Sequence, residues 1–523
     1  MRFRNWLTRE WPTIAIITVG ILLQVFLITR PIETVTATTL SDDAFFYFKV
    51  AHNISQGFGS TFDGVNPANG YHPLWMLVLV PIFQWFGSSV PDVPPLYALL
   101  YLSVAMNLVT AFVVARILTR FTESRWIRAF ALIIWVLNPF LLYQQLNGLE
   151  TSLALFFFSF VFLLALRIEE RKQNNLDARA RDYWLIGALS AFMIMARLDM
   201  AFYLVAFLAW IFLKEGLSGW KNALRTAAIP AVFTGIYELW NYVNFKMILP
   251  ASAKAEMLFS HVLTYQDNGE TFAQFIKAII YFTHYVAIAV MRDTGAYALA
   301  AATFGMFIAL CIRGDIKIPR SLSEIRVTAA LFVGFLMLFI GNASVRWAAR
   351  DWYFVSFDLF FAIAVCIVLA KLFPYITYKR AVSVVLLGAI VLAFYANWSK
   401  YLRWPKNPGW NHGDLILAAD WMSANLPEGS RVGSFTPGVM GYFSKAPVVA
   451  LDGLINNSSY VAMRERKLWQ FMKDDTTHFV ETGNHITYSF KSFFGTDEDL
   501  FAKMTKLPND PGLPNMTFYK LKP

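Results

Sequence analysis

Charged residues are scarce in this chain of 523 residues, where Asp, Glu, Lys and Arg together make up 15% of the sequence. Soluble globular proteins carry about 25% charged residues. Hydrophobic residues make up 57% of the chain and occur in repeated long apolar runs. The shortage of charge therefore excludes an ordinary soluble domain and indicates a polytopic helical membrane protein.

Cysteine is also nearly absent. The two cysteines, Cys311 and Cys366, each lie inside an apolar run, which excludes a disulfide framework and a cysteine-based metal site. No segment has the G-x-x-x-x-G-K-[ST] or G-x-G-x-x-G pattern, so a nucleotide-phosphate loop is not supported. Aromatic residues, in contrast, make up 17% of the chain, as expected for aromatic belts at two membrane interfaces.

The apolar runs predict eleven transmembrane helices, although several are shorter than the roughly 20 residues that a span needs. The predicted spans are 12–29, 94–115, 128–143, 152–166, 183–196, 200–213, 226–244, 295–312, 327–342, 352–370 and 381–398. Two further apolar stretches, 73–87 and 271–291, are ambiguous. We expect both to lie along the outer interface as juxtamembrane helices.

The distribution of Lys and Arg supports this topology. With eleven spans, the N-terminus and the loops that carry most of the Lys and Arg face the cytoplasm, as the positive-inside rule requires. The net charge of +10 is then a topology signal and not evidence for nucleic-acid binding. We expect a multi-pass protein of the inner (cytoplasmic) membrane, with a cytoplasmic N-terminus and an exoplasmic, periplasmic C-terminus.

The composition changes near residue 399, after which no apolar run is long enough to span a membrane. We therefore predict a transmembrane module over 1–398, with a first outer loop at 30–93, and an exoplasmic soluble α/β domain over 399–523. Within that domain the pattern predicts a helix at 414–425 and short strands at 431–435, 448–451 and 517–521.

Polar residues that could carry chemistry gather in the predicted outer loops. Asp42 and Asp43 open an aromatic segment at the membrane edge, where charge is costly unless it is solvated or functional. Pure capping of the following helix is the alternative for this pair. The other outer-loop candidates are His72, Asn147, Glu150, Arg197, Asp199, Lys254, Arg346 and Arg350.

These other candidates also have structural alternatives. Glu150 could be a first-turn charge of the next span, and Arg197 with Asp199 could be an ion pair at a helix break. The three later cations could contact lipid headgroups. His72 could be a packing or hydrogen-bonding residue.

Several motifs resemble those of the GT-C superfamily of membrane glycosyltransferases. The first outer loop contains Asp-Asp-Ala-Phe-Phe-Tyr at 42–47, Gly-Ser-Thr-Phe-Asp-Gly at 59–64 and Asn-Pro-Ala-Asn-Gly-Tyr-His-Pro-Leu-Trp at 66–75. More narrowly, the chain is similar to the branch with the bacterial cell-wall arabinofuranosyltransferases. Further motifs of that branch are matched at 147–151, 196–199, 249–254, 438–444 and 451–456.

This resemblance implies transfer of a sugar, arabinofuranose or another pentose or hexose, from a polyprenyl-phosphate donor to an exoplasmic glycan or lipid acceptor, with inversion. Asp42 or Asp43 would be the general base, with Asp42 slightly preferred. Donor phosphate would be bound by Lys254, Arg346, Arg350 and Arg197.

The resemblance also suggests residues that orient the site and, in some members, a metal. Glu150, Asp199, His72 and Asn147 would orient the acceptor or the site. A divalent cation (Mg, Mn or Ca) is a further option, with Asp42, Asp43 and Glu150 as its ligands.

Two other classes remain open at this point. A flippase or transporter of lipid-linked sugar would need polar groups in mid-membrane, where the predicted spans are largely apolar. A non-catalytic membrane protein could bind glycan through 399–523.

Overall fold

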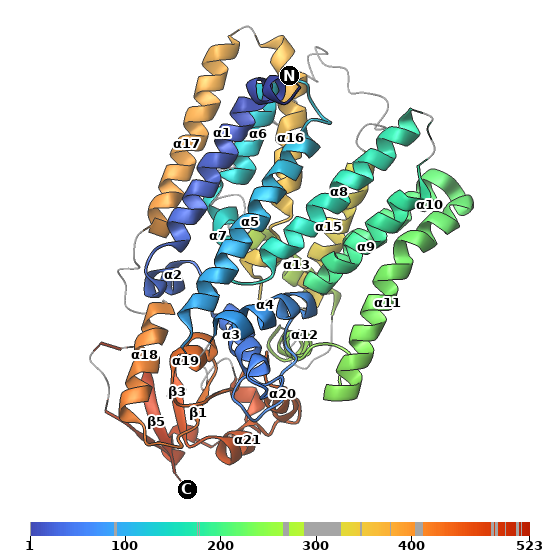
Figure 1. The fold of residues 1–523 in the computed structure, drawn as a ribbon. Coiled ribbons are helices and arrows are strands. Elements are labelled where there is room, and N and C mark those ends of the chain that lie inside the picture. Colours follow the sequence, from blue (N-terminus) through green and yellow to red (C-terminus); the bar gives the residue numbers. More distant parts are fainter. Residues whose placement is uncertain are drawn as a thin grey trace.

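The computed structural model describes residues 2–87, 91–174, 176, 178–264, 271–286, 326–345, 348–376, 378–402, 412–482, 486, 490–496, 498–508, 512–513 and 515–522. A bundle of long helices forms one end of the molecule and a small sheet with short helices forms the other (Figure 1). The N-terminus lies at the far end of the bundle, and the C-terminus lies at the far end of the sheet domain. The predicted division into a helical module and a C-terminal α/β region is thus seen in space.

The bundle consists of long helices that follow the predicted spans. They are α1 (Arg2–Ile28), α5 (Val93–Leu118), α6 (Arg125–Val136), α7 (Pro139–Gln145), α8 (Thr151–Gln173), α9 (Ala180–Ala196), α10 (Ala201–Glu215), α11 (Trp220–Phe245), α15 (Arg326–Val345), α16 (Phe357–Leu372) and α17 (Lys379–Leu402). Short 3-10 or π turns occur at η1 (Leu198–Met200), η2 (Gly216–Gly219), η3 (Ser260–Thr264), η6 (Asp351–Tyr353), η7 (Phe373–Tyr375), η8 (Lys491–Phe493) and η9 (Leu500–Lys503).

Six helical segments in the described part are long and apolar enough to cross a membrane, which indicates a multi-pass membrane protein. They are Glu10–Ile28, Val93–Leu118, Thr151–Gln173, Leu198–Phe245, Arg326–Val345 and Phe357–Tyr375. A seventh is added if α6 and α7, which meet at a 55° bend, form one broken span. The predicted span 295–312 lies outside the described residues, and the total of eleven stays a prediction.

The bend between α6 and α7 follows from the local sequence. Asn138 accepts a hydrogen bond from the backbone N–H of Phe140 and so caps α7, and Pro139 occupies the first position of that helix. Proline is well suited to that position because its missing N–H would have no partner there. The turn at η2 likewise begins with a glycine, Gly216, at φ +62°.

Shorter helices lie at the boundary between the bundle and the sheet domain (Figure 1). They are α2 (Ile32–Thr38), α3 (Asp42–Ser55), α4 (Pro73–Phe86), α12 (Ala251–Phe259) and α13 (Phe272–Val286). The helix α4 covers the ambiguous stretch 73–87 and has 14 residues. At 1.5 Å per residue it is too short to cross a hydrocarbon core of about 30 Å. The stretch 271–291 begins as α13, and its last residues lie outside the described part.

The C-terminal domain holds a five-stranded sheet in the order β2-β1-β3-β5-β4. Its elements are α18 (His412–Asn425), β1 (Val432–Ser434), α19 (Gly438–Phe443), β2 (Val448–Ala450), α20 (Asn457–Arg464), α21 (Leu468–Asp475), β3 (His478–Glu481), β4 (Met504–Lys506) and β5 (Thr517–Leu521). The strands β2, β1 and β3 are parallel, and β5 is antiparallel to β3 and β4. The helix and the three strands predicted from the sequence are confirmed as α18, β1, β2 and β5.

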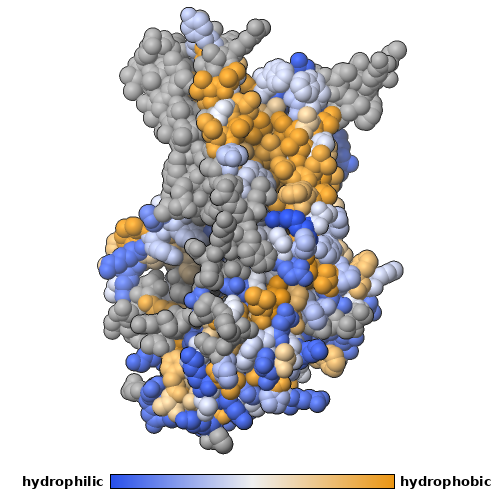
Figure 2. All heavy atoms as spheres, turned by 90° about the vertical axis from the view of Figure 1, so that its left-hand side faces the viewer, coloured by the Kyte–Doolittle hydropathy of each residue, from blue (hydrophilic) through white to orange (hydrophobic). Residues whose placement is uncertain are grey.

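Surface hydropathy follows the same division. Figure 2 shows hydrophobic atoms gathered over the helical bundle and hydrophilic atoms over much of the sheet domain. A large buried apolar core runs from the bundle into the domain and includes residues as distant as Phe45 and Tyr442, whose ring centroids are 5.5 Å apart. The two parts therefore pack on each other through apolar side chains.

The first outer loop also attaches to the C-terminal domain through polar contacts. Arg431 reaches Asp63 at 3.4 Å and Asp475 at 3.0 Å. Asn66 donates to Asp475, and the backbone of Ala68 forms an isolated bridge with Asn456. These contacts attach the domain to the part of the first outer loop that follows α3.

Candidate active site

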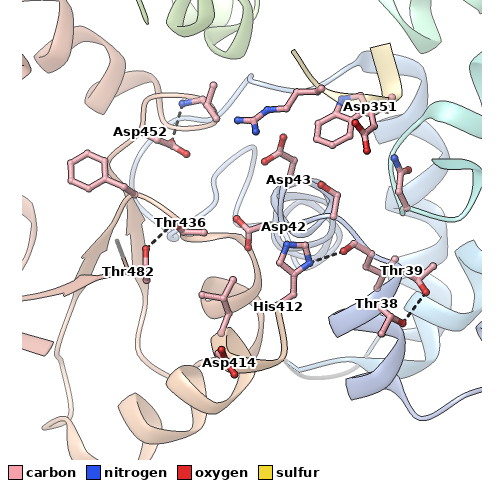
Figure 3. A pocket seen from close by; sticks show the side chains of 18 of the residues that line it. Thr38, Thr39, Asp42, Asp43, Asp351, His412, Asp414, Thr436, Asp452 and Thr482 are labelled. Carbon is pink, nitrogen blue, oxygen red and sulfur yellow. Dashed lines mark hydrogen bonds between the residues drawn. The ribbon is translucent and has the colours of Figure 1, made fainter. Parts of the chain in front are cut away.

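A cavity of about 540 Å³ lies where the N-terminal end of α3 meets the C-terminal domain. Its polar lining comes from both parts of the chain (Figure 3). The lining residues with polar side chains include Thr38, Thr39, Ser41, Asp42, Asp43, Gln144, Asn147, Arg350, Asp351, His412, Asp414, Thr436, Asp452, Thr482 and Asn515. The cavity thus brings together residues that lie several hundred positions apart in the sequence.

Asp42 and Asp43 occupy the first turn of α3, where negative charge is favoured by the helix dipole. Ser41 stands at the N-cap but its side chain makes no capping hydrogen bond. The backbone N–H of Ser41 instead donates to the carbonyl of Asn147 at 2.9 Å. The start of α3 is thereby held against the 146–150 loop.

Asp42 is bound by the C-terminal domain. Its Oδ1 accepts the N–H of Val439 at 2.8 Å, and its Oδ2 accepts the N–H of Gly438 at 3.3 Å. Burial raises the pKa of the Asp42 carboxyl, while the nearby His412 and the N–H of Val439 act in the opposite direction. A Cβ at Gly438 would lie 2.2 Å from the carbonyl oxygen of Asp42, so only glycine permits this approach.

Asp43 has a different environment. Within the described part of the chain its carboxylate makes no hydrogen bond, and Arg350 has the largest opposing effect on its pKa. Burial raises the pKa of the Asp43 carboxyl; Arg350 and His412 lower it, and Glu150 raises it. The same pairing raises the pKa of Arg350 and keeps its guanidinium charged. An ionisable carboxylate and a permanent cation therefore face the same space.

The loop that follows α7 supports α3 through Asn147 and Gly148. Asn147 accepts the N–H of Leu149 at 3.0 Å and donates to Gln144 at 3.2 Å. Gly148 has φ +82°, and its carbonyl accepts the indole N–H of Trp75 at 3.0 Å. Asn147 lines the cavity and shapes this turn, and its orienting role stays a prediction.

Glu150 belongs to a neighbouring cluster behind the cavity wall. Its carboxylate is buried, accepts the hydroxyl of Tyr47 at 3.1 Å, and lies 3.8 Å from His72 and 3.9 Å from Arg197. Neither Glu150 nor His72 lines the cavity. Glu150 acts on the site at a distance, through its effect on Asp43.

Arg197 and Asp199 form an ion pair at the break after α9, as one of the two sequence interpretations expected. The guanidinium contacts Asp199 at 2.9 Å and 3.2 Å and donates to the carbonyl of Trp352 at 2.5 Å. Trp352 lines the cavity next to Arg350. Arg197 therefore fixes the 350–353 segment and is itself not part of the cavity wall.

The remaining predicted phosphate ligands are Lys254, Arg346 and Arg350. Lys254 is half-buried on α12, and this helix reaches the cavity through Phe259 and not through Lys254. Arg346 lies outside the described residues. Arg350 is the only Lys or Arg that lines the cavity in the described part of the chain.

Several lining residues were not assigned a role from the sequence. His412 donates from Nδ1 to the carbonyl of Leu40 at 2.8 Å and so bridges α18 and the first outer loop. Thr436, Asp452 and Thr482 each follow a strand of the parallel part of the sheet. Their position at strand ends is a sequence signal, but its use requires knowing that these strands are parallel neighbours.

The suggested metal ligands Asp42, Asp43 and Glu150 do not converge on one point, since Glu150 is held behind the cavity wall by Tyr47, His72 and Arg197. The described residues contain no group of three or more His, Cys, Asp or Glu arranged to hold a metal ion.

Comparison with known proteins gives the family context. A family model described as "Domain of unknown function" (DUF8728) matches residues 409–506, and no curated protein matches the sequence. The structure is similar to the crystal structure of the Archaeoglobus fulgidus oligosaccharyltransferase in the apo form, with a TM-score of 0.60 and 13% identity, over 94% of this chain and 71% of that chain.

Two structures of ArnT from Cupriavidus metallidurans are also similar, each with a TM-score of 0.52 and 12% identity. The apo structure matches over 99% of this chain and 98% of that chain. The structure bound to undecaprenyl phosphate matches over 96% of this chain and 97% of that chain. At these identities the likeness shows the fold alone: the chain is folded like these proteins.

Proposed function

We propose that this protein is a membrane glycosyltransferase that moves a sugar from a polyprenyl-phosphate donor to an acceptor hydroxyl on the outer side of the membrane. The observation that carries the proposal is the cavity at the edge of the bundle, in which Asp43 faces Arg350. The GT-C type of fold supports it. One similar structure, ArnT, is bound to undecaprenyl phosphate, which supports a donor of that lipid class.

The transfer needs a base for the acceptor and a cation for the leaving group. The acceptor oxygen attacks the anomeric carbon from the face opposite the phosphate, and Asp43 takes the hydroxyl proton. The bond between the anomeric carbon and the phosphate oxygen breaks, and polyprenyl phosphate leaves with the bonding electrons. Arg350 stabilises the negative charge that develops on that phosphate. The anomeric configuration is inverted.

We assign the base role to Asp43 in place of Asp42, which the sequence alone slightly favoured. Both oxygens of Asp42 accept backbone N–H groups of α19. Asp43 makes no such bond in the described part of the chain, so its carboxylate is free to accept a proton from the acceptor hydroxyl. Burial raises the pKa of both carboxyls, so the hydrogen bonds of Asp42, and not the pKa shifts, carry this choice.

The other predicted residues take supporting roles in this proposal. Lys254 and Arg346 remain proposed contacts of the lipid phosphate. Arg197 and Asp199 position the segment that carries Arg350, and Glu150 adjusts the pKa of Asp43. His72 beside Glu150 and Asn147 in the cavity wall are the two other proposed orienting residues.

The proposal also includes the cell location and the sugar. The bundle would span the inner membrane with the N-terminus in the cytoplasm and the sheet domain in the periplasm. Arabinofuranose is the first sugar to test because of the motif resemblance, followed by other pentoses and hexoses. Dependence on a divalent cation is tested by adding EDTA and then restoring Mg, Mn or Ca.

The test is a donor screen with purified full-length protein in detergent or nanodiscs. Each polyprenyl-phosphate sugar of a panel is incubated with the protein, and released polyprenyl phosphate and new glycoside are quantified by mass spectrometry. We expect one donor to be consumed with an inverted product, and Asp43→Asn to abolish consumption. Movement of labelled lipid across vesicles without release of polyprenyl phosphate would instead identify a flippase and overturn the proposal.

A further inference from the structure

The carboxyl ends of three parallel strands open into the cavity. Thr436 follows β1, Asp452 follows β2 and Thr482 follows β3, and all three residues line the cavity. In open α/β sheets, ligands bind in the crevice beyond the carboxyl ends of the strands. Figure 3 shows these residues on one side of Asp42 and Asp351 on the other. The strand ends therefore form a separate wall that faces the reacting carboxylates.

The polar groups of this wall can bind hydroxyls. The hydroxyls of Thr436 and Thr482 lie 3.0 Å apart and share one hydrogen bond. Because each hydroxyl has one donor and two acceptor sites, this pair retains a free hydrogen and further lone pairs.

Asp452 adds a buried carboxylate to the same wall. Asp452 is only 4% exposed, and its Oδ1 accepts the N–H of Leu454 at 3.0 Å. The next residue, Gly453, has φ +70°, and a Cβ there would lie 3.1 Å from atoms of Tyr460 and Met463. The turn that presents Asp452 thus requires glycine.

An apolar surface accompanies these polar groups. The rings of Phe435 and Phe490 stack with centroids 4.1 Å apart and an interplanar angle of 21°, and both residues line the cavity. Specific small-molecule sites combine apolar and aromatic walls with a few placed polar groups. A sugar ring, with C–H groups on its faces and hydroxyls at its rim, fits such a combination.

The charge of this wall selects against anions. The single lining Lys or Arg in the described part, Arg350, lies beside Asp43, and the strand ends contribute the Asp452 carboxylate and two hydroxyls. Burial raises the pKa of Asp452 well above its usual value, and the nearby Asp43 and Asp42 raise it further. A phosphate or uronate placed at the strand ends would meet buried acidic groups and, among the described lining residues, no Lys or Arg of that wall.

We infer that the strand ends, with Thr436, Asp452 and Thr482 as its polar groups, form a binding subsite for a neutral, hydroxyl-rich sugar. Its identification as the acceptor subsite rests on the proposed function. The lipid phosphate then occupies the side of the cavity near Arg350, and the acceptor sugar occupies the sheet side. The C-terminal domain is in this view a specificity-determining part of the active site.

The binding test needs no donor and uses saturation-transfer difference NMR on the detergent-solubilised full chain. The probes are methyl β-D-glucopyranoside, methyl α-D-mannopyranoside, methyl α-D-arabinofuranoside and glucuronic acid. We expect at least one neutral glycoside to bind and glucuronic acid to bind more weakly. Affinity should fall about 10-fold in Asp452→Asn and in the double variant Thr436→Val with Thr482→Val.

Matched controls are Thr505→Val on the exposed part of β4 and Asp474→Asn on α21, which should bind as the wild type does. Equal affinity of the subsite variants and the wild type, or preferential binding of glucuronic acid, would overturn the inference. Thermal unfolding curves identify any variant that fails to fold. The Thr and Asp variants remove different polar groups of the same subsite, so a loss of binding in both supports the subsite independently.

A kinetic test separates this inference from the proposed function. With the donor found in the screen, the subsite variants should raise KM for a glycoside acceptor about 10-fold and leave KM for the donor and its slow hydrolysis unchanged. A rise in donor KM without a change in acceptor KM would assign the strand ends to the donor and refute the acceptor subsite. Binding of glycosides without turnover of any donor would leave the subsite intact and refute the transferase.

Discussion

At the scale of single residues, the adjacent aspartates Asp42 and Asp43 have different environments. Asp42 accepts two backbone N–H groups from the C-terminal domain, and Asp43 lines the cavity with Arg350, whose charge lowers the pKa of Asp43. The first arrangement anchors a carboxylate, and the second leaves it available beside a cation. In the proposed mechanism the chemical role falls to Asp43 and the packing role to Asp42.

The first prediction concerns the dependence of kcat/KM on pH. Asp43 must be deprotonated to act as a base, so kcat/KM falls as the pH drops below its pKa, which burial raises. Arg350 lowers that pKa, so Arg350→Gln should raise it further and move the acid limb of the pH profile to higher pH. The maximal rate should also fall by roughly 10²–10³, because the leaving phosphate loses its cation.

The control for this profile is Arg464→Gln, which removes an exposed cation of α20 that pairs with Glu465. It should leave both the acid limb and the rate unchanged. An acid limb that stays in place in Arg350→Gln would show that Asp43 is not the titrating base.

The sequence could predict part of this site and not the rest. Asp42 and Asp43 were found because two charges at a membrane edge are unusual in themselves. Asp452 and His412 lie hundreds of positions away, and their approach depends on how the domain packs on α3. Whether Glu150 lines the cavity or stands behind it is a matter of a few ångströms, which spacing along the chain does not encode.

At the scale of elements, the contact between α19 and α3 connects the C-terminal domain to the helical part of the molecule. The first N–H groups of α19 meet Asp42, and Tyr442 and Phe443 of α19 pack their rings against Phe45 of α3. Asp42 thereby accepts N–H groups that have no partner within the first turn of α19. The helices and strands themselves were largely predictable from apolar runs and alternation, but this pairing was not.

The second prediction tests the contact between α19 and α3. In Gly438→Ala the new Cβ would lie 2.2 Å from the carbonyl oxygen of Asp42, so α19 must move away from α3. We expect a loss of stability of roughly 1–3 kcal/mol, typical of overpacking, and a lower transfer rate. Thermal unfolding and a transfer assay measure the two effects.

Gly235→Ala is the matched control, because a Cβ at that position of α11 meets nothing within 4 Å. It should be neutral or slightly stabilising. Wild-type stability and activity in Gly438→Ala would show that the close approach is not required.

At the scale of the whole molecule, the C-terminal domain packs against the helical bundle and forms one wall of the cavity. Its position is fixed by the shared apolar core and by the network of Asp63, Asn66, Arg431 and Asp475. Composition predicted two regions with a change near 399. It could not predict that the cavity would lie between them, because that depends on contacts between distant segments.

The third prediction concerns this network. Arg431→Gln removes the cation that links Asp63 of the first outer loop to Asp475 of the domain. We expect faster hydrogen exchange in both segments and a lower transfer rate, with the bundle helices unaffected. Arg464→Gln should exchange as the wild type does, and unchanged exchange in Arg431→Gln would mean that the apolar core alone holds the domain.

The most direct test of the central claim is a single-turnover transfer assay that compares wild-type protein with Asp43→Asn, using the donor identified in the screen. A base that is lost in this way typically contributes 10²–10⁴-fold, so we predict a fall in rate of about 100-fold or more with unchanged donor affinity. Wild-type turnover in Asp43→Asn would contradict the assignment of Asp43 as the base.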